Sequence, residues 1–530
     1  MKKSSFQALL MLTLMVITIV ACNKNNKKEY VTNPPSEDTE TLIAAITPIN
    51  SKLPADVLKS CVVTPTDFSS WFKSKSVSKN GIVTPANSVT FTHQNNCDFY
   101  KWSEQMFLWM TSPKQEGDYK SGTVIETPAF YTVSPINVVN NVKERTLIPH
   151  VSGQMITAVA NTQKNDLPID SEEGQATDDV LIAQKNDSIL YYITMVNDVY
   201  AKFVLGAKTG KLFDNEFPTT QTTLDSIETF ATSIGKPLKD PETLAIEIKT
   251  SWVDVTGLSD SNDYITMDAI VPNYTKTDTL WTPNTTKPTR KAKLALIGIH
   301  IVGSTAGHPE MVWATFEHVN NAPNLSYKYL NNSTPPETIT VAADTGNDWL
   351  LNDDSASSTY NQSHMKYESG DIVANTKTNP EQTITASNTK MTKPWGVADA
   401  GVPNPENASV AASNSQIIST NNSVLGQLAN GDMRKNYIFI GATWTNDGAA
   451  PTGKSYSVKD TLTASGVAIG TSQLANSTME TYAQNGSAYS QYGTCFSCHS
   501  KNDGLLPTDL SHVYKEIMAG IVPKKATKTP

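Results

Sequence analysis

The sequence has few charged residues and no excess of basic ones. Asp, Glu, Lys and Arg make up 18% of its 530 residues, a low share against roughly 25% in typical soluble proteins, and this excludes a coiled coil or a charged disordered tail. The 42 basic residues are outnumbered by 51 acidic residues, so no overall basic field exists to hold the phosphates of DNA or RNA. We therefore expect no nucleic acid among the partners of the chain.

Beyond the first 21 residues the sequence also lacks an apolar stretch that reads as a membrane span. Lys2 and Lys3 precede an apolar stretch, Phe6 to Ala21, that is too short to span a bilayer comfortably and is typical of a signal peptide. Ile19-Val20-Ala21-Cys22 resembles a bacterial lipobox. In that class of proteins the peptidase cuts before the cysteine, whose thiol then carries a lipid. The alternative is an ordinary signal peptide followed by an incidental Cys22.

The resemblance to a lipobox predicts where the chain is located. We expect a lipoprotein signal peptide over residues 1–21 and a lipid-anchored flexible tether over residues 22–50, where the sequence is polar. Asn23 stands where an aspartate commonly retains such lipoproteins in the inner membrane. The chain is therefore expected to be a bacterial outer-membrane lipoprotein that faces the periplasm or the cell surface and touches the membrane through its lipid anchor.

Cysteine is scarce, with five residues in the whole chain. Cys22 is assigned to the lipid, and two further cysteines belong to a motif near the C-terminus. The remaining two, Cys61 and Cys97, would lie in an oxidising compartment, where a pair of cysteines persists as a disulfide. We predict this disulfide and keep two buried thiols as the alternative, because geometry cannot be tested from the sequence.

The middle of the chain alternates short β-rich segments with turn residues. The segments predicted as strands are 244–255, 264–271, 293–302, 311–319 and 437–444. An amphipathic helix is predicted over residues 98–110, where apolar residues recur three and four apart. Residues 331–358 and 375–421 are predicted as exposed polar loops. The predicted fold class is a β-rich α+β fold, with an antiparallel β body and decorating loops over residues 51–470.

The residues that carry chemistry lie near the C-terminus, at Cys495-Phe496-Ser497-Cys498-His499. Two cysteines three apart followed by histidine form the attachment signature of c-type haem, in which the thiols add to the haem vinyl groups and the imidazole reaches the iron. A zinc site would need a second pair of ligands, and a thioredoxin-like dithiol would normally lie near a βαβ unit. We therefore predict one covalent haem c, with Cys495 and Cys498 as attachment residues and His499 as the proximal iron ligand.

A short helical haem-binding segment is predicted over residues 471–530, with one helix over 471–484 and another over 509–521. Few residues follow the motif, so the haem pocket must borrow walls from the β body. The sixth iron ligand remains open between Met479, His512 and Met518, and an open coordination site is a further alternative. Met479 and His512 are the preferred candidates for the sixth ligand.

A second group of candidates consists of His300, His308 and His318, with Glu310 and Glu317 nearby in the sequence. Histidines on apolar faces are more often hydrogen-bonded core groups than ligands. If these three histidines are functional, they bind a metal or supply acid–base chemistry beside the haem. His300 or His318 could also fold back to the iron as a distant ligand.

Three groups of residues accompany the haem motif. They are Asn96-Cys97-Asp98-Phe99-Tyr100-Lys101-Trp102 with Gln105-Met106-Phe107-Leu108-Trp109, Gly298-Ile299-His300-Ile301-Val302 with Trp313-Ala314-Thr315-Phe316-Glu317-His318-Val319, and Asn476-Ser477-Thr478-Met479-Glu480-Thr481-Tyr482. Together with the motif they resemble an exported bacterial cytochrome c family whose role is largely uncharacterised. The resemblance is spread over most of the mature chain. It implies a cytochrome c whose haem segment is built onto this β-rich body, and it implies no known substrate.

Three functions are compatible with these features. The leading one is an extracytoplasmic, lipid-anchored monohaem cytochrome c that carries electrons between redox protein partners, because covalent haem on a tethered acidic protein is sufficient for that. The alternative is a haem c redox enzyme, peroxidase-like or oxidase-like, with a substrate pocket in the β-rich body, because the chain is longer than electron transfer alone needs. The third is a surface binding module whose haem is structural or sensory.

Overall fold

The fold is described from a computed structural model of the chain. It describes residues 52–139, 142–157, 159–160, 179–362, 364–368, 370–376, 379, 381–396, 409–451, 464–471, 473–485, 495–499 and 506–519. The chain divides into two compact units, Met1–Ile46 and Thr47–Pro530, and every described residue belongs to the second. The predicted signal peptide, the tether and Cys22 therefore lie outside the described residues. No helix in the described part is long and apolar enough to cross a membrane.

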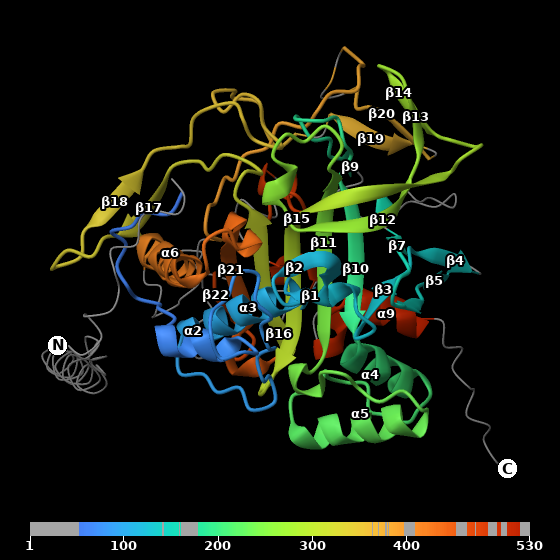
Figure 1. The fold of residues 1–530 in the computed structure, drawn as a ribbon, viewed down its shortest axis with the longest axis vertical. Helices are drawn as coiled ribbons and strands as arrows, with labels where there is room; N and C mark the ends of the chain where they lie inside the picture. The colour runs from blue at the N-terminus through green and yellow to red at the C-terminus, as the bar shows by residue number, and fades with distance from the viewer. Residues whose placement is uncertain are drawn as a thin grey trace, which may run out of the picture. The chain divides into compact units, whose positions relative to one another are not determined.

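A large sheet forms the centre of the fold (Figure 1). Its strands, in spatial order, are β22 (Ala468–Gly470), β21 (Tyr437–Thr445), β16 (His308–His318), β15 (Thr289–Thr305), β11 (Ile246–Asp254), β10 (Tyr191–Asn197), β3 (Phe130–Val133) and β6 (Leu147–Pro149), with β12 (Thr266–Pro272) beside β15 and β7, β7 (Ile156–Thr157) beside β12, and β8 (Val159–Ala160) beside β10. The described pairs of this sheet are antiparallel except β7 with β12. The predicted β-rich, antiparallel body is confirmed, and the five predicted strands correspond to β11, β12, β15, β16 and β21.

Smaller sheets and the helices surround the large sheet. The smaller sheets are β13 (Tyr274–Lys276), β14 (Leu280–Pro283), β20 (Asp371–Ala374), β19 (Met365–Glu368) and β9 (Asp179–Val180) in one, and the pairs β1 (Pro113–Gln115) with β2 (Asp118–Thr123), β4 (Asn137–Val139) with β5 (Val142–Glu144), and β17 (Tyr327–Leu330) with β18 (Thr338–Val341). The α-helices are α2 (Pro65–Trp71), α3 (Asn96–Met110), α4 (Asp198–Lys208), α5 (Gln221–Ser233), α6 (Val410–Gln427), α8 (Cys495–His499) and α9 (His512–Ala519). Because β18 lies within residues 331–358, that segment is not all loop as predicted.

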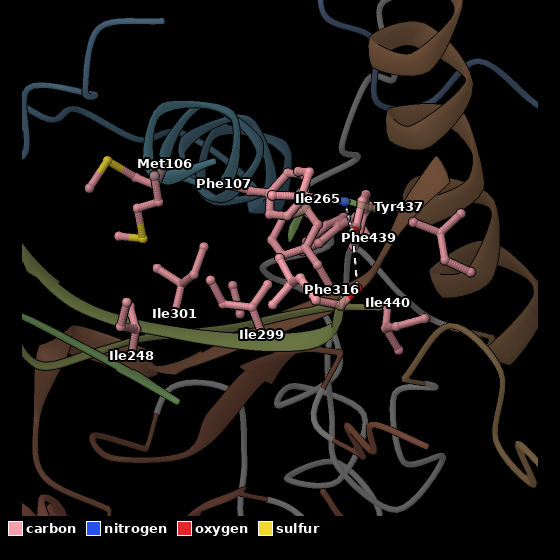
Figure 2. Close-up of a cluster of buried hydrophobic side chains, with 14 of the residues drawn as sticks. Met106, Phe107, Ile248, Ile265, Ile299, Ile301, Phe316, Tyr437, Phe439 and Ile440 are labelled. Atoms are coloured by element: carbon pink, nitrogen blue, oxygen red, sulfur yellow. Dashed lines mark hydrogen bonds between the residues drawn. The ribbon is translucent and has the colours of Figure 1, made fainter. Parts of the chain in front are cut away.

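Helix α3 packs on one face of the large sheet, here called the first face. A capping box starts the helix, since the Asn95 side chain accepts from the backbone of the first turn and the Asp98 carboxylate accepts from the backbone before it. Phe107 stacks on Phe316 of β16 with ring centroids 4.3 Å apart, and Figure 2 shows Met106 above Ile301 of β15. The apolar face of the helix predicted over 98–110 therefore belongs to the core.

Helix α6 corrects the prediction of a loop over residues 375–421. Its sequence is rich in Ser and Asn, yet nearly all of its side chains are buried. Several of its polar groups bond to backbone outside the helix: the Asn421 amide donates to the carbonyl of Phe439 and accepts from its N–H, both at 2.8 Å. Ser419 donates to the carbonyl of Cys61 at 2.7 Å. The helix was not predicted because its buried side chains are largely polar, so the sequence shows no apolar periodicity.

The opposite face of the large sheet, here called the second face, carries Trp313, Thr315 and Glu317 of β16 and Gly298, His300 and Val302 of β15. Residues 473–485 lie against it as turns and a short 3₁₀-helix, so the predicted helix over 471–484 is wrong for the described residues. A Cβ at Gly298 would lie 2.6 Å from the hydroxyls of both Ser251 and Thr478. Glycine therefore lets this segment approach the sheet closely.

Candidate haem site

The haem motif occupies the single-turn helix α8 on the second face of the sheet. Phe496 is fully buried and meets Trp313 edge-on, with ring centroids 5.6 Å apart. Cys495 is half-buried and packs beside the same apolar cluster. Residues four apart on a helix share a face, so Cys495 and His499 lie on the same side of this turn. The side chain of Cys498 lies outside the described part of the chain.

The imidazole of His499 is oriented by a backbone carbonyl. Its Nδ1 lies 2.9 Å from the carbonyl oxygen of Leu510. A carbonyl oxygen only accepts, so Nδ1 carries the proton and the lone pair of the ring is on Nε2. Trp313 contacts the ring edge-on at a centroid distance of 4.5 Å. A hydrogen bond from the second ring nitrogen to a carbonyl is the usual support of a metal-binding histidine.

His512, which was predicted as a sixth iron ligand, lies next to His499 in the structure. Its ring stacks on the His499 ring and does not face it across a gap. The two rings are stacked, with centroids 4.4 Å apart and planes at 12°. The His512 ring therefore covers one face of the His499 ring. In this arrangement His512 would support His499 from the side if His499 bound a metal.

Met479, the other preferred sixth ligand, belongs to a different part of the core. It is 1% exposed and packs with Tyr192, Tyr264 and Leu350 in a cluster separate from the one that contains Phe496. Met518 of α9 packs at the border of the Phe496 cluster. The structure therefore groups Met518 and His512 with the motif, and Met479 with another cluster.

Charged groups hold α9 and the chain before it against the body. Arg145 and Glu516 form a nearly buried ion pair. The Ser511 hydroxyl donates to Glu247 of β11 at 2.6 Å, and Glu247 also accepts from Tyr200. Burial raises the pKa of Glu247, although these hydroxyls oppose the shift. The segment that carries Leu510 is thus fixed between two contacts to the body.

The three clustered histidines of β15 and β16 do not form one site. His300 points to the second face and lies 2.9 Å from Glu480. His308 is buried elsewhere, with Nδ1 2.9 Å from Glu310 Oε1. His318 stacks on Tyr264 at 3.9 Å, and burial lowers its pKa to about 3. Among the described residues no group of three or more His, Cys, Asp or Glu side chains is placed to hold a metal ion.

Cys61 and Cys97 form a disulfide in the structure, with Cα atoms 5.4 Å apart. Cys97 lies in the first turn of α3, and Cys61 lies in the segment that α6 holds through Ser419. The disulfide therefore joins the start of α3 to the segment that is hydrogen-bonded to α6. It is remote in sequence from the haem motif.

The described donors fit a c-type haem. His499 has the hydrogen bond from one ring nitrogen that supports a metal-binding histidine, and Cys495 is one helical turn away on the same side. Analysis of the sequence missed two supporting groups, the Trp313 indole and the Leu510 carbonyl. Trp313 belongs to one of the sequence stretches on which the family resemblance was based. That stretch was an indirect indication that Trp313 lies near the motif. A backbone carbonyl leaves no signal in a sequence.

No family model, no curated protein and no solved structure matches the chain.

Proposed function

We propose that this protein is an extracytoplasmic, lipid-anchored monohaem cytochrome c that carries electrons between redox protein partners. The observation that supports it best is the 2.9 Å hydrogen bond between His499 Nδ1 and the Leu510 carbonyl, within the Cys-x-x-Cys-His sequence. A histidine in a thioredoxin-like dithiol motif has no need of such support, whereas an iron ligand does. The bound haem would supply one-electron chemistry.

The residues of the chain would have separate tasks in this function. Cys495 and Cys498 would attach the cofactor, and His499 would bind the iron through Nε2. Leu510 holds the proton of His499 at Nδ1, and Trp313 limits the rotation of the ring. Apolar walls around Phe496 would exclude water, which controls reduction potential in haem proteins.

The location and partners follow from the N-terminal sequence and the charge. The lipobox-like residues before Cys22 support attachment to the bacterial outer membrane, facing the periplasm or the surface. The excess of acidic residues supports protein partners and not nucleic acid. We also base this proposal on the resemblance of the sequence to an exported bacterial cytochrome c family.

A haem c redox enzyme, peroxidase-like or oxidase-like, is the second candidate. The observation that favours it is a partly exposed polar strip on the second face of the sheet, formed by Thr194, Lys249 and His300 in neighbouring strands. Such a strip beside Trp313 could admit a small polar substrate. Turnover of peroxide or an organic electron donor by the purified protein would support the enzyme over the carrier.

Covalent attachment is the decisive test of the proposed function. Protein expressed with its leader in a host that matures c-type cytochromes should keep haem after denaturation, as measured by intact mass and by a thioether-type haemochrome spectrum. The double variant Cys495→Ala, Cys498→Ala should lose it. Extraction of the haem from wild-type protein by acidified organic solvent would contradict the proposal.

A further inference from the structure

The first residues of β16 include a buried carboxylate with one oxygen that has no partner. Glu310 is fully buried. Its Oε1 accepts from the Thr445 N–H of β21 at 3.1 Å and lies 2.9 Å from His308 Nδ1. Its Oε2 is buried and has no hydrogen-bond partner among the described residues, where its ion-pair partner is His308. Burial of a carboxylate in this state is costly unless a cation compensates the charge.

The contacts of Glu310 indicate which nitrogen of His308 is free. Oε1 already accepts from a backbone N–H, which favours an ionised oxygen, so His308 Nδ1 donates to it. The lone pair of the imidazole is then on Nε2. Within the described residues His308 has no further hydrogen bond, so Nε2 is available to a ligand. A histidine that donates one ring N–H to a carboxylate has the arrangement of a metal ligand.

A second imidazole, that of His93, lies beside His308. The two ring centroids are 5.0 Å apart, with the ring planes at 64°. The loop that carries His93 is attached to the hairpin between β15 and β16, since the Ser88 carbonyl accepts from the Ala306 N–H at 2.9 Å. Both imidazoles also contact the ring of Phe99, at 4.5 Å and 5.0 Å. The fold thus brings together two histidines that are far apart in the sequence.

The spacing of the two rings fits one shared metal ion. Imidazole nitrogens lie about 2.0–2.1 Å from a zinc ion, and two imidazoles on one tetrahedral ion therefore have ring centroids about 5 Å apart. The observed distance is 5.0 Å. His93 is exposed, and its side chain has no hydrogen bond in the described part of the chain. Its ring can therefore turn toward an ion while His308 is held by Glu310.

Aromatic packing alone explains less of this arrangement. Phe99 stacks on Trp444 at 4.0 Å, so the rings around the two histidines belong to the core. This packing accounts for the burial of His308, but not for a carboxylate behind it that has an unpartnered oxygen. A dication on Nε2 polarises the imidazole and strengthens the hydrogen bond from Nδ1 to Glu310, which compensates the buried charge.

We propose that His93 and His308 bind a divalent transition-metal ion, with Glu310 as the positioning residue behind His308. Water would fill the other positions of the ion, since the described residues hold no group of three or more potential ligands. Structural zinc sites have four protein ligands, so an ion held by two should exchange with the solution. The site uses none of the residues assigned to the haem and does not rest on the proposed function.

The test titrates the full-length protein, without a histidine tag, with copper(II), which binds such sites most tightly among the divalent first-row ions. Electron paramagnetic resonance counts the coordinating nitrogens, and wild type should show two imidazoles. His93→Ala should show one and bind at least about tenfold more weakly, since a lost ligand costs no less than a lost supporting residue. Because His93 is exposed, this variant should fold. His364→Ala changes a half-buried histidine on β19's flank and is the matched control, expected to bind as wild type does.

Glu310→Gln tests the positioning role. The variant keeps the shape of the side chain and an acceptor for His308 Nδ1, but it removes the charge. Loss of a carboxylate behind a metal-binding histidine typically costs about 10- to 100-fold in metal affinity. We expect a loss in that range with both imidazoles still in the resonance signal, which a merely structural role of Glu310 would not produce. Circular dichroism checks that each variant is folded, and His93→Ala decides the site if Glu310→Gln fails to fold.

Three results would overturn the proposal. They are a wild-type signal with fewer than two imidazoles, a His93→Ala protein that binds copper(II) as tightly as wild type, and a His364→Ala protein that has lost the binding. Equal affinities of wild type and Glu310→Gln would overturn the role of Glu310. Covalent haem enters none of these measurements, so a failure of the proposed function and a failure of this site are distinguishable.

Discussion

The rings of His499 and His512 lie parallel, with centroids 4.4 Å apart and planes at 12°. His512 is the first residue of α9, and His499 is the last residue of α8. Their stacking joins the two helices at the point where the Leu510 carbonyl binds His499. His512 therefore supports the His499 ring from the side.

In the proposed haem protein, His512→Asn should consequently leave the spin state of the ferric iron as it is in wild type. The variant removes a stacking partner of His499 but no group in the direction of the Nε2 lone pair. Visible absorption and electron paramagnetic resonance of the ferric protein measure the outcome, with wild type as reference. A high-spin spectrum that imidazole restores would make His512 the sixth ligand after all.

Removing Arg145 should destabilise the packing of α9 at the C-terminal end of the described chain. Arg145 and Glu516 are nearly buried, so Arg145→Met leaves a buried carboxylate without its cation, which costs about 3 kcal/mol or more. Denaturant unfolding measures the loss of free energy, and hydrogen exchange should locate it in α9. Glu368→Gln breaks the exposed pair with Lys366 and is the control, expected to cost less than about 1 kcal/mol. If both variants lost the same free energy of unfolding, the buried Arg145–Glu516 pair would not stabilise the fold more than an exposed pair does.

Glu104 should make the stability of the fold depend on pH. Burial raises the pKa of this carboxyl from 4.5 to about 8, and its Oε1 has no hydrogen-bond partner among the described residues. The folded state then binds a proton that the unfolded state releases, so stability falls as the pH rises from about 4.5 to about 8 and is constant above that range.

Glu104→Gln should therefore flatten this dependence. Each pKa unit corresponds to about 1.4 kcal/mol, so the variant should gain several kcal/mol relative to wild type between pH ~5 and pH ~8. Urea unfolding at the two pH values measures the difference. A constant difference between the two proteins would mean that Glu104 titrates normally.

Cys22→Ala should release the protein from membranes or block its maturation, because the thiol that carries the lipid is lost. Fractionation of cells followed by immunoblotting measures the distribution. Asn23→Asp is a matched variant, since an aspartate at that position should move the protein to the inner membrane and keep it anchored. A Cys22→Ala protein that matures normally and stays in the membrane fraction would refute the lipobox.

The main strands and α3 could be predicted because their apolar residues repeat with a period of two or of three to four. Helix α6 could not, because its Asn and Ser side chains resemble a loop and find their partners only after folding, as Asn421 does at Phe439. The predicted helix over 471–484 failed in the opposite direction, because its polar side chains bond to the sheet. Asn476 and Ser477 bond to β16 instead of supporting a helix.

The motif could be predicted from its spacing, but the rest of the site depends on tertiary structure. Trp313 and His300 reach the second face only because β15 and β16 pair in one register. A shift of one residue in either strand would turn the side chain that this strand carries to the other face. The pairing of His300 with Glu480 joins residues 180 positions apart, and no local pattern in the sequence indicates it.

The acceptor that orients His499 is a main-chain carbonyl, and this affects how the site can vary during evolution. A substitution at position 510 changes the side chain but keeps the oxygen, so many residues can occupy that position without loss of the hydrogen bond. Related chains should therefore show no paired substitutions between positions 499 and 510. They should instead keep the buried, apolar character of Leu510, because its packing fixes the path of the chain and so the place of the oxygen.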